Sequence, residues 1–99
     1  MAFYTYIVAN HRNGAVYIGM TDDIARRVLE YKERARPGFS ATYGCDKLVW
    51  FETHETREAA FKRERQLKEW RRSWKLMLIE TGNPTWTDLY SGLAERPNA

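Results

Sequence analysis

The sequence predicts a single small domain of the α/β class, in its α+β form, with three β-strands and three helical segments. The chain of 99 residues is long enough for one domain with its own core. Three short segments rich in aromatic and β-branched residues favour strands, and longer segments with apolar residues at helical spacing favour helices. We expect residues 1–90 to form this domain and residues 91–99 to be a frayed tail.

The first two strands are predicted over residues 3–8 and 15–20. Between them, the dipeptide Asn13-Gly14 is the strongest short signal for a hairpin, because a type I′ turn needs a positive φ at both of its central residues. These two strands are therefore expected to pair with each other. A third, well-buried strand is predicted over residues 48–51.

A two-residue turn would also set the register of the hairpin. It would pair Val8 with Gly19 and place Tyr6 opposite Thr21. Residues that face each other across two strands share one face of the sheet, so Tyr6 and Tyr17 are expected to project the same way. A slip of one residue would separate the two tyrosines, because the side-chain period of a strand is two.

The first helix is predicted to begin at Thr21-Asp22-Asp23, where a capping hydroxyl is followed by two carboxylates near the positive end of the helix dipole. Its apolar stripe comprises Ile24, Val28 and Tyr31. Pro37-Gly38 would end the helix. The polar stretch from there to residue 46 is expected to form a loop.

Two further helices are predicted in the second half of the chain. One runs from a cap at Thr56 to about Trp70, and the next covers residues 72–80 and ends at Gly82. The tryptophans of this half are interpreted as core residues, with stacking on nucleic-acid bases as the alternative. They are Trp70, Trp74 and Trp86.

Glu64 is the most informative residue of the second predicted helix, because it projects into the apolar face. That face is marked by Ala60, Phe61, Leu67 and Trp74. A carboxylate in such a place costs several kcal/mol unless a metal, a cation or a hydrogen-bond network compensates. The alternative is a structural ion pair with Lys68, one turn later. We favour a functional role for Glu64.

The net charge of +3 conceals two basic stretches. Residues 57–75 carry eight basic side chains against three glutamates, and residues 26–36 carry five against two, so the remaining residues sum to −5. Basic helices on an acidic body suit a polyanion such as nucleic acid, because each phosphate contact releases counterions. Solvated helix exteriors are the alternative.

The single cysteine, Cys45, excludes a disulfide framework and a zinc site built on cysteines. No apolar segment is long enough to span a membrane, and the N-terminal residues lack the pattern of a signal peptide. We therefore expect a reduced, cytoplasmic protein with no membrane partner.

The paired tyrosines, an arginine at the inner edge of the first helix and the inward glutamate together resemble the GIY-YIG nuclease domain. The resemblance covers about residues 3–90 and is closest to small, single-domain bacterial members. The matching elements are Tyr4-Thr5-Tyr6, Tyr17-Ile18-Gly19 ten residues later, Thr21, Asp23, Arg27, Tyr31, and the segments 63–68 and 82–89. The resemblance implies a three-stranded antiparallel sheet flanked by helices, and metal-dependent hydrolysis of phosphodiester bonds in DNA.

The resemblance also implies catalytic roles for six residues. They are Tyr6, Tyr17, Arg27, Tyr31, Glu64 and Asn83. Glu64 would bind one Mg²⁺ or Mn²⁺, a hard ion that suits a lone carboxylate completed by waters and a phosphate oxygen. Tyr17 would orient or deprotonate the attacking water, with Tyr6 beside it. A cation, expected to be Arg27, would lower the pKa of Tyr17 and stabilise the transition state.

Other positions refine this expectation. Asn83 would either contact the site or brace the turn before Pro84. Tyr4 and Thr5 replace the first two residues of the family motif, and Met20 stands where incision-type members carry a lysine, so one cation is missing near Tyr17.

Basic side chains would contact DNA phosphates and read shape more than sequence. They are Arg26, Arg34, Arg63, Lys68, Arg71, Arg72 and Lys75.

The leading hypothesis is that the chain is a metal-dependent DNA endonuclease, either structure-selective or weakly selective. The first alternative is a non-catalytic nucleic-acid-binding module on the same fold, in which Glu64 is structural. The second alternative is a protein-interaction domain that uses tryptophan and arginine as anchors, residue types that are enriched at binding hot spots.

Overall fold

The computed structural model describes residues 2–35 and 37–93, so Arg36 and most of the predicted tail, residues 94–99, lie outside the described residues. The elements in chain order are β1 (Phe3–Ala9), β2 (Val16–Thr21), α1 (Ile24–Lys32), α2 (Phe39–Tyr43), β3 (Lys47–His54), α3 (Arg57–Glu69), α4 (Arg72–Gly82) and α5 (Tyr90–Leu93). The strands form one antiparallel sheet in the order β2-β1-β3. The predicted α+β class and three-stranded sheet are confirmed.

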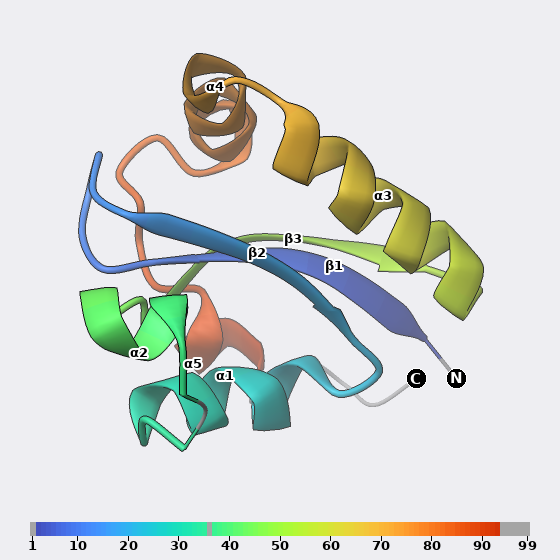
Figure 1. The fold of residues 1–99 in the computed structure, drawn as a ribbon, viewed down its shortest axis with the longest axis horizontal. Helices are drawn as coiled ribbons and strands as arrows, with labels where there is room; N and C mark the ends of the chain where they lie inside the picture. The colour runs from blue at the N-terminus through green and yellow to red at the C-terminus, as the bar shows by residue number, and fades with distance from the viewer. Residues whose placement is uncertain (1, 36, 94–99) are drawn as a thin grey trace.

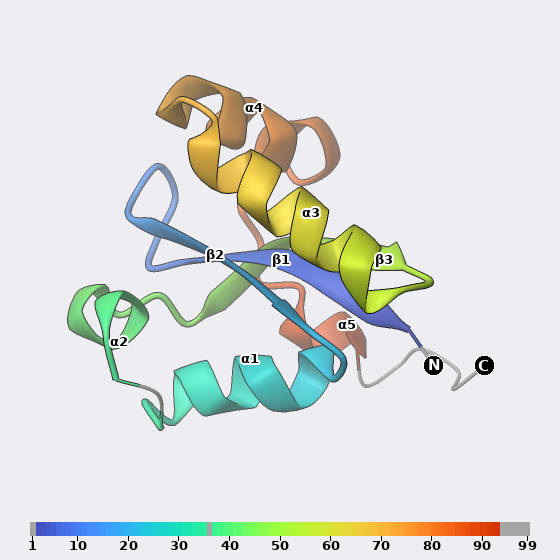
Figure 2. The same ribbon diagram turned by 45° about the vertical axis from the view of Figure 1, so that its right-hand side comes forward.

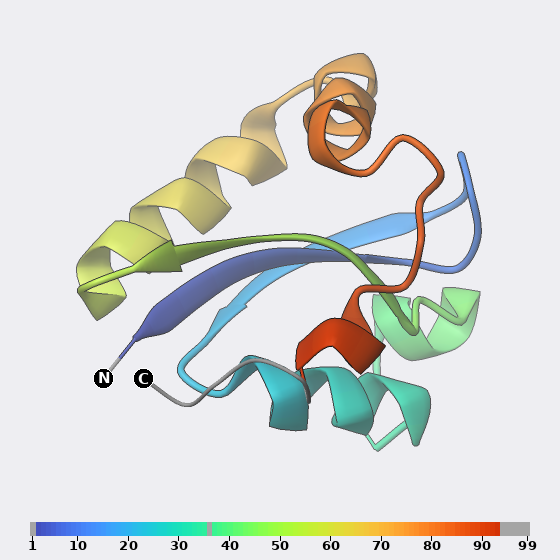
Figure 3. The same cartoon turned by 180° about the vertical axis from the view of Figure 1, so that it is seen from behind.

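The sheet separates two helical layers. α3 and α4 cover one face, whereas α1, α2 and α5 lie on the other (Figure 1), and the view from behind shows the same division (Figure 3). Successive side chains of a strand point to opposite faces of its sheet, so those of the central strand β1 enter both helical layers. Tyr6 and Val8 join the core on the α1 side, and Ile7 and Ala9 join the core on the α3 side. The two basic stretches therefore lie mainly on opposite sides of the sheet.

The predicted hairpin register is wrong by two residues. Tyr6 pairs with Gly19 rather than with Thr21, because the connection is longer than a two-residue turn. Asn10 closes this connection: its backbone N–H donates to the Ala15 carbonyl, and its side-chain oxygen accepts from the Ala15 N–H. A slip of two residues leaves each side chain on its predicted face. The two tyrosines of the hairpin therefore still project the same way.

The N-cap of α1 is Asp23 rather than Thr21. The Asp23 carboxylate accepts a hydrogen bond from the backbone N–H of Arg26, while the Thr21 hydroxyl oxygen accepts one from the Asp23 N–H. The helix ends at Lys32, before the predicted stop at Pro37. Its predicted apolar stripe is buried and is therefore confirmed. The stripe comprises Ile24, Val28 and Tyr31.

The stretch expected to be a polar loop contains α2, a helix of five residues. Gly38 precedes it with a φ of 116°, and Gly44 follows it with a φ of 66°, both in the region that favours glycine. A helix this short spans little more than one turn, so its sequence is too short for the repeated apolar spacing on which the other helices were predicted. It carries two exposed rings, Phe39 and Tyr43.

The bounds of α3 and α4 agree closely with the predicted helices. α3 is held against the sheet by Leu67, which is fully buried, and by the Ala60 carbonyl, which accepts a hydrogen bond from Thr5 Oγ1. Phe61 and Trp74, both assigned to the apolar face, are instead 43% and 48% exposed. No helix in the described part of the chain is long and apolar enough to cross a membrane.

Candidate active site

β2 is an edge strand that runs between the two helical layers (Figure 2). Side chains from β1, β2, α1 and α3 meet around it in two groups. The buried group comprises Tyr6, Arg27 and Tyr31, and the edge group comprises Tyr17, Glu64 and Lys68. Five of the six predicted catalytic residues belong to these groups.

Hydrogen bonds join the three side chains of the buried group, in which Arg27 is the most exposed member. The hydroxyls of Tyr6 and Tyr31 share a hydrogen bond of 2.6 Å, and Arg27 Nη1 donates to Tyr6 Oη at 3.4 Å. Arg27 also donates to the Met20 carbonyl and pairs with Glu30 at 3.3 Å. Burial raises the pKa of Tyr6 and of Tyr31 above the ordinary tyrosine value. Both phenols therefore stay protonated at neutral pH.

Gly19 allows Tyr6 to reach this position. A Cβ atom on residue 19 would stand 2.3 Å from Tyr6 Oη and 2.6 Å from its ring carbon Cζ. Neither contact is sterically possible without moving the Tyr6 ring, which is fully buried. The glycine of the Tyr17-Ile18-Gly19 segment therefore has a packing role that is independent of any chemistry.

Tyr17 is partly buried, and three groups from different elements surround its ring. The Lys68 ammonium lies 5.6 Å from the ring centroid. Tyr31 approaches edge-on at 6.2 Å, and Phe39 of α2 stacks at 6.2 Å with ring planes 25° apart. A cation therefore reaches the Tyr17 ring from α3. The guanidinium of Arg27, the cation expected to act on Tyr17, is bonded to Tyr6 and to the Met20 carbonyl.

Lys68 joins Tyr17 to Glu64. Its Nζ atom also lies 3.8 Å from Glu64 Oε1, one turn earlier on α3. The Glu64 side chain is 18% exposed, whereas that of Lys68 is 47% exposed. Glu64 is therefore largely buried, as its helical position predicts, although Phe61, expected beside it, is exposed. The Lys68 ammonium therefore lies near both the Tyr17 ring and the Glu64 carboxylate.

Asn83 is bonded to β3, on the opposite edge of the sheet from β2. Its side-chain amide donates to the carbonyls of Val49 and Thr87, and its Oδ1 accepts from the Thr87 N–H. The residue is 8% exposed. These bonds brace the turn after α4 against the sheet, which is the second of the two roles predicted for Asn83.

The fit of a metal ion depends on Glu64. Among the residues that the structure describes, no three His, Cys, Asp or Glu side chains cluster to hold a metal. Glu64 offers one hard oxygen ligand, which suits Mg²⁺ or Mn²⁺ because such ions keep several waters and bind substrate phosphate. A structural zinc ion would need several nitrogen or sulfur ligands. The donor set therefore fits a hard divalent ion.

The predicted DNA-contacting residues are unequally available. Arg63 donates to a carboxylate on β3, Arg72 to two carbonyls of the hairpin loop, and Arg34 to a carbonyl of α2. The other four are half-buried or exposed cations: Arg26 on α1, and Lys68, Arg71 and Lys75 at the junction of α3 and α4. That junction adjoins the edge group through Lys68.

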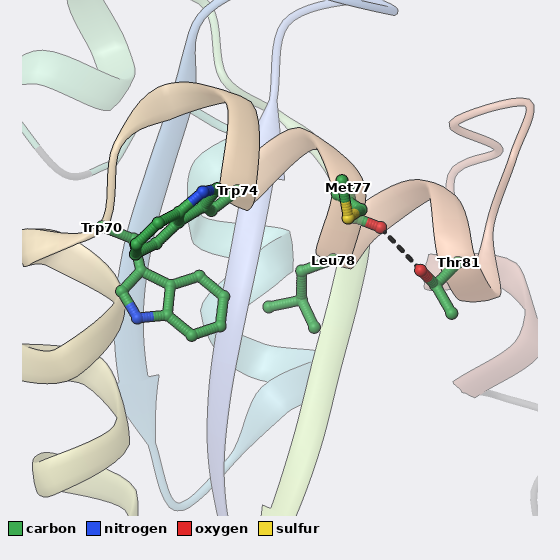
Figure 4. Close-up of a pocket in the computed structure, with 5 residues that line it drawn as sticks. All are labelled: Trp70, Trp74, Met77, Leu78 and Thr81. Carbon is green, nitrogen blue, oxygen red and sulfur yellow. Dashed lines mark hydrogen bonds between the residues drawn. The ribbon is translucent and has the colours of Figure 1, made fainter.

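An apolar pocket of about 370 Å³ lies along α4 (Figure 4). It is lined by Trp70, Trp74, Met77, Leu78 and Thr81. Trp74 contributes an exposed ring, so its assignment to the core is wrong. Trp86 is buried and donates through Nε1 to Glu80, in agreement with the predicted core role.

Comparison with known proteins agrees with this fold. Residues 2–77 match the GIY-YIG catalytic domain. A UPF0213 protein of Haloquadratum walsbyi is 40% identical over 81 residues, covering 80% of this chain and 88% of that protein. A UPF0213 protein of Staphylococcus saprophyticus is 32% identical over 79 residues, covering 80% and 95%. The solution NMR structure of a UPF0213 protein from Bacillus halodurans superposes with a TM-score of 0.55 at 24% identity, covering 89% and 93%.

Proposed function

Because the chain belongs to the GIY-YIG catalytic domain family, we propose that it is an endonuclease that hydrolyses phosphodiester bonds in DNA. The family is of nuclease type, and its members generally depend on a divalent metal ion. The finer parts of the proposal are one Mg²⁺ or Mn²⁺ ion at Glu64, a cytoplasmic location, and weak selectivity or selectivity for DNA structure.

The observation that carries the proposal is the edge group. Lys68 places a positive charge between the Tyr17 ring and the Glu64 carboxylate. A substrate phosphate would be attracted to Lys68, while Tyr17 stands partly open to water. Since a general base must reach the proton that it removes, Tyr17 is better placed than the two buried tyrosines.

Each residue then has a distinct task. Glu64 would hold the divalent ion, which would polarise the phosphate and offset charge on the leaving 3′ oxygen. Tyr17 orients the attacking water and accepts its proton, and Lys68 places its positive charge against the Tyr17 ring. Arg27 fixes the buried group and offsets negative charge near the phosphate.

The test is a nicking assay on branched, flapped and plain duplex DNA with Mg²⁺ or Mn²⁺. We expect Glu64→Ala to cleave about 100-fold more slowly or worse, because no other ligand replaces the carboxylate. Glu69→Ala is the matched control, since Glu69 is an exposed glutamate near the end of the same helix, and its rate should stay within about twofold of the wild type. Equal cleavage by Glu64→Ala and the wild type on every substrate would overturn the proposal.

One observation favours the alternative of a non-catalytic nucleic-acid-binding module. Lys68 already pairs with Glu64, and such a pair alone would account for an inward carboxylate. A partly exposed pair of this kind stabilises by about 1 kcal/mol at most. The alternative predicts that Glu64→Gln lowers the free energy of unfolding and that DNA binds in a salt-sensitive manner without turnover. A metal-binding role predicts unchanged or slightly raised stability.

A further inference from the structure

The two rings of α2 have no part in the proposed chemistry, yet they face water. Phe39 is 46% exposed and Tyr43 is 53% exposed. Their ring centroids lie 4.5 Å apart. Aromatic rings gain free energy mainly by burial, so an exposed pair in a helix of five residues gains little from the fold itself.

Phe39 connects this pair to the edge group. Its ring stacks on Tyr17, and Tyr17 in turn contacts Tyr31 edge-on. The rings therefore form a continuous series that begins in the buried group, passes the proposed base and ends at Tyr43 on the surface. A substrate phosphate at Lys68 would bring its neighbouring nucleotide next to this series.

Two cations lie close to this series of rings. The Lys68 ammonium lies against the Tyr17 ring, and Arg34 Nη1 donates to the carbonyl of Ala41 in the middle of α2. α2 itself carries no charged side chain. A polyanionic strand that crosses α2 would therefore meet aromatic faces bordered by cations, the combination found where proteins hold single strands.

We propose that Phe39 and Tyr43 form a stacking platform for an unpaired nucleobase of the substrate strand, next to the phosphate at the edge group. The inference rests on the proposed nuclease function and specifies its substrate class. That class is DNA with an unpaired base, as in a single strand or a flap. In a continuous duplex the base faces are already stacked on one another. Because every base has a π-face, the platform selects for strand structure and not for sequence.

A nucleobase fits this platform better than a docked protein does. The α4 pocket is an apolar surface lined by Trp74 and Met77 among others, and it suits an apolar side chain of a partner. The α2 platform is instead a pair of rings, continuous with Tyr17 and bordered by Lys68 and Arg34. Its shape and charge match a flat base attached to a phosphate.

The test measures binding without cleavage, in the presence of a chelator. A labelled single-stranded oligonucleotide and the blunt duplex of the same sequence are titrated with the wild type, with the double variant Phe39→Ala/Tyr43→Ala and with Phe39→Leu, which keeps apolar bulk without a ring. We expect the double variant to bind the single strand about tenfold more weakly, with Phe39→Leu in between and duplex binding within about twofold. Phe61→Ala is the matched control, because Phe61 is equally exposed on α3.

Three results would overturn the platform. They are unchanged single-strand affinity in the double variant, an equal loss for both forms of DNA, and, with Trp74→Ala titrated alongside, a loss confined to that variant, which would move base binding to the α4 pocket. A wild type that binds neither form would overturn the platform as well. Failure of the nuclease proposal is distinguishable, since it shows as equal cleavage by the wild type and Glu64→Ala whatever the platform variants do.

Discussion

Tyr6 and Tyr17 project from the same face of one hairpin into opposite environments. Tyr6 is fully buried, and its hydroxyl is bonded to Tyr31 and Arg27. Tyr17 is partly exposed, and its ring is flanked by the Lys68 ammonium. The same residue type thus fixes geometry at one position and faces water at the other. The difference follows from strand order, because β1 is central and β2 is an edge strand.

Asn83 and Glu64 repeat this contrast. Every hydrogen bond that the Asn83 side chain makes is to backbone, which is typical of a residue that holds a turn. Within the described part of the chain, the charged partner of Glu64 is a long, half-exposed lysine at 3.8 Å, so its carboxylate can accept other ligands at small cost. Residues of the buried kind should affect stability when changed, and residues of the edge kind should affect cleavage.

The largest effect on stability is expected for Gly19→Ala. The new Cβ would overlap Tyr6 Oη, at 2.3 Å, and would force the buried ring to move, at a cost of about 2–3 kcal/mol in the free energy of unfolding. Gly82→Ala is the control, because among the described residues no atom beyond its chain neighbours and its own helix backbone lies within 4 Å of the added Cβ. Urea unfolding measures both. A Gly19→Ala protein as stable as the wild type would show that the buried group is not tightly packed.

Asn83→Ala comes next, with an expected loss of about 2 kcal/mol, because the buried carbonyl of Val49 and the N–H of Thr87 lose their partner. The rate of cleavage per folded molecule should not change. Thr85→Ala, an exposed hydroxyl of the same turn, should cost less than about 0.5 kcal/mol. A cleavage defect in Asn83→Ala at full stability would place this residue in the chemistry.

The last prediction concerns how the free energy of unfolding depends on pH. Since burial raises the folded-state pKa of Tyr6 and of Tyr31, the unfolded chain loses these protons first. The stability that these two tyrosines contribute is fully present below about pH 10, the tyrosine pKa in the unfolded chain. It is lost as the pH rises above that value, by at most about 1.4 kcal/mol per pH unit for each tyrosine. Tyr31→Phe should reduce this slope, and Tyr43→Phe, at an exposed ring, should not. Equal slopes would contradict the buried character of Tyr31.

Much of the fold was predictable from local signals. Strand composition, the Thr56 cap and the apolar stripe of α1 each depend on residues close in sequence, and each agrees with the structure. The register was wrong because the Asn10 side chain closes a longer connection than the Asn13-Gly14 dipeptide suggests. The error left Tyr6 and Tyr17 on their predicted face of the sheet, because a shift of two residues equals the side-chain period of a strand. α2 was missed because five residues are too few for a period.

The sequence predicted most of the residues that meet at the candidate site, but it did not predict the contacts between them. The burial of Glu64 followed from its helical position, whereas the contact between Lys68 and Tyr17 joins two elements far apart in sequence, which no local pattern encodes. For the same reason the cation at Tyr17 was assigned to Arg27. The α2 rings beside Tyr17 were missed with the helix itself, although two aromatic residues four apart between glycines would have been a usable signal.

The central claim is that the edge group performs the chemistry while the buried group positions it. Its most direct test is single-turnover cleavage of flapped DNA by Tyr17→Phe and Tyr6→Phe, with rates expressed per folded molecule. Loss of a proton acceptor at Tyr17 should slow cleavage about 100-fold or more, whereas Tyr6→Phe should stay within about tenfold of the wild type and lose stability by about 1 kcal/mol. A Tyr17→Phe protein that cleaves at the wild-type rate, or a Tyr6→Phe protein that is the slower of the two, would contradict the claim.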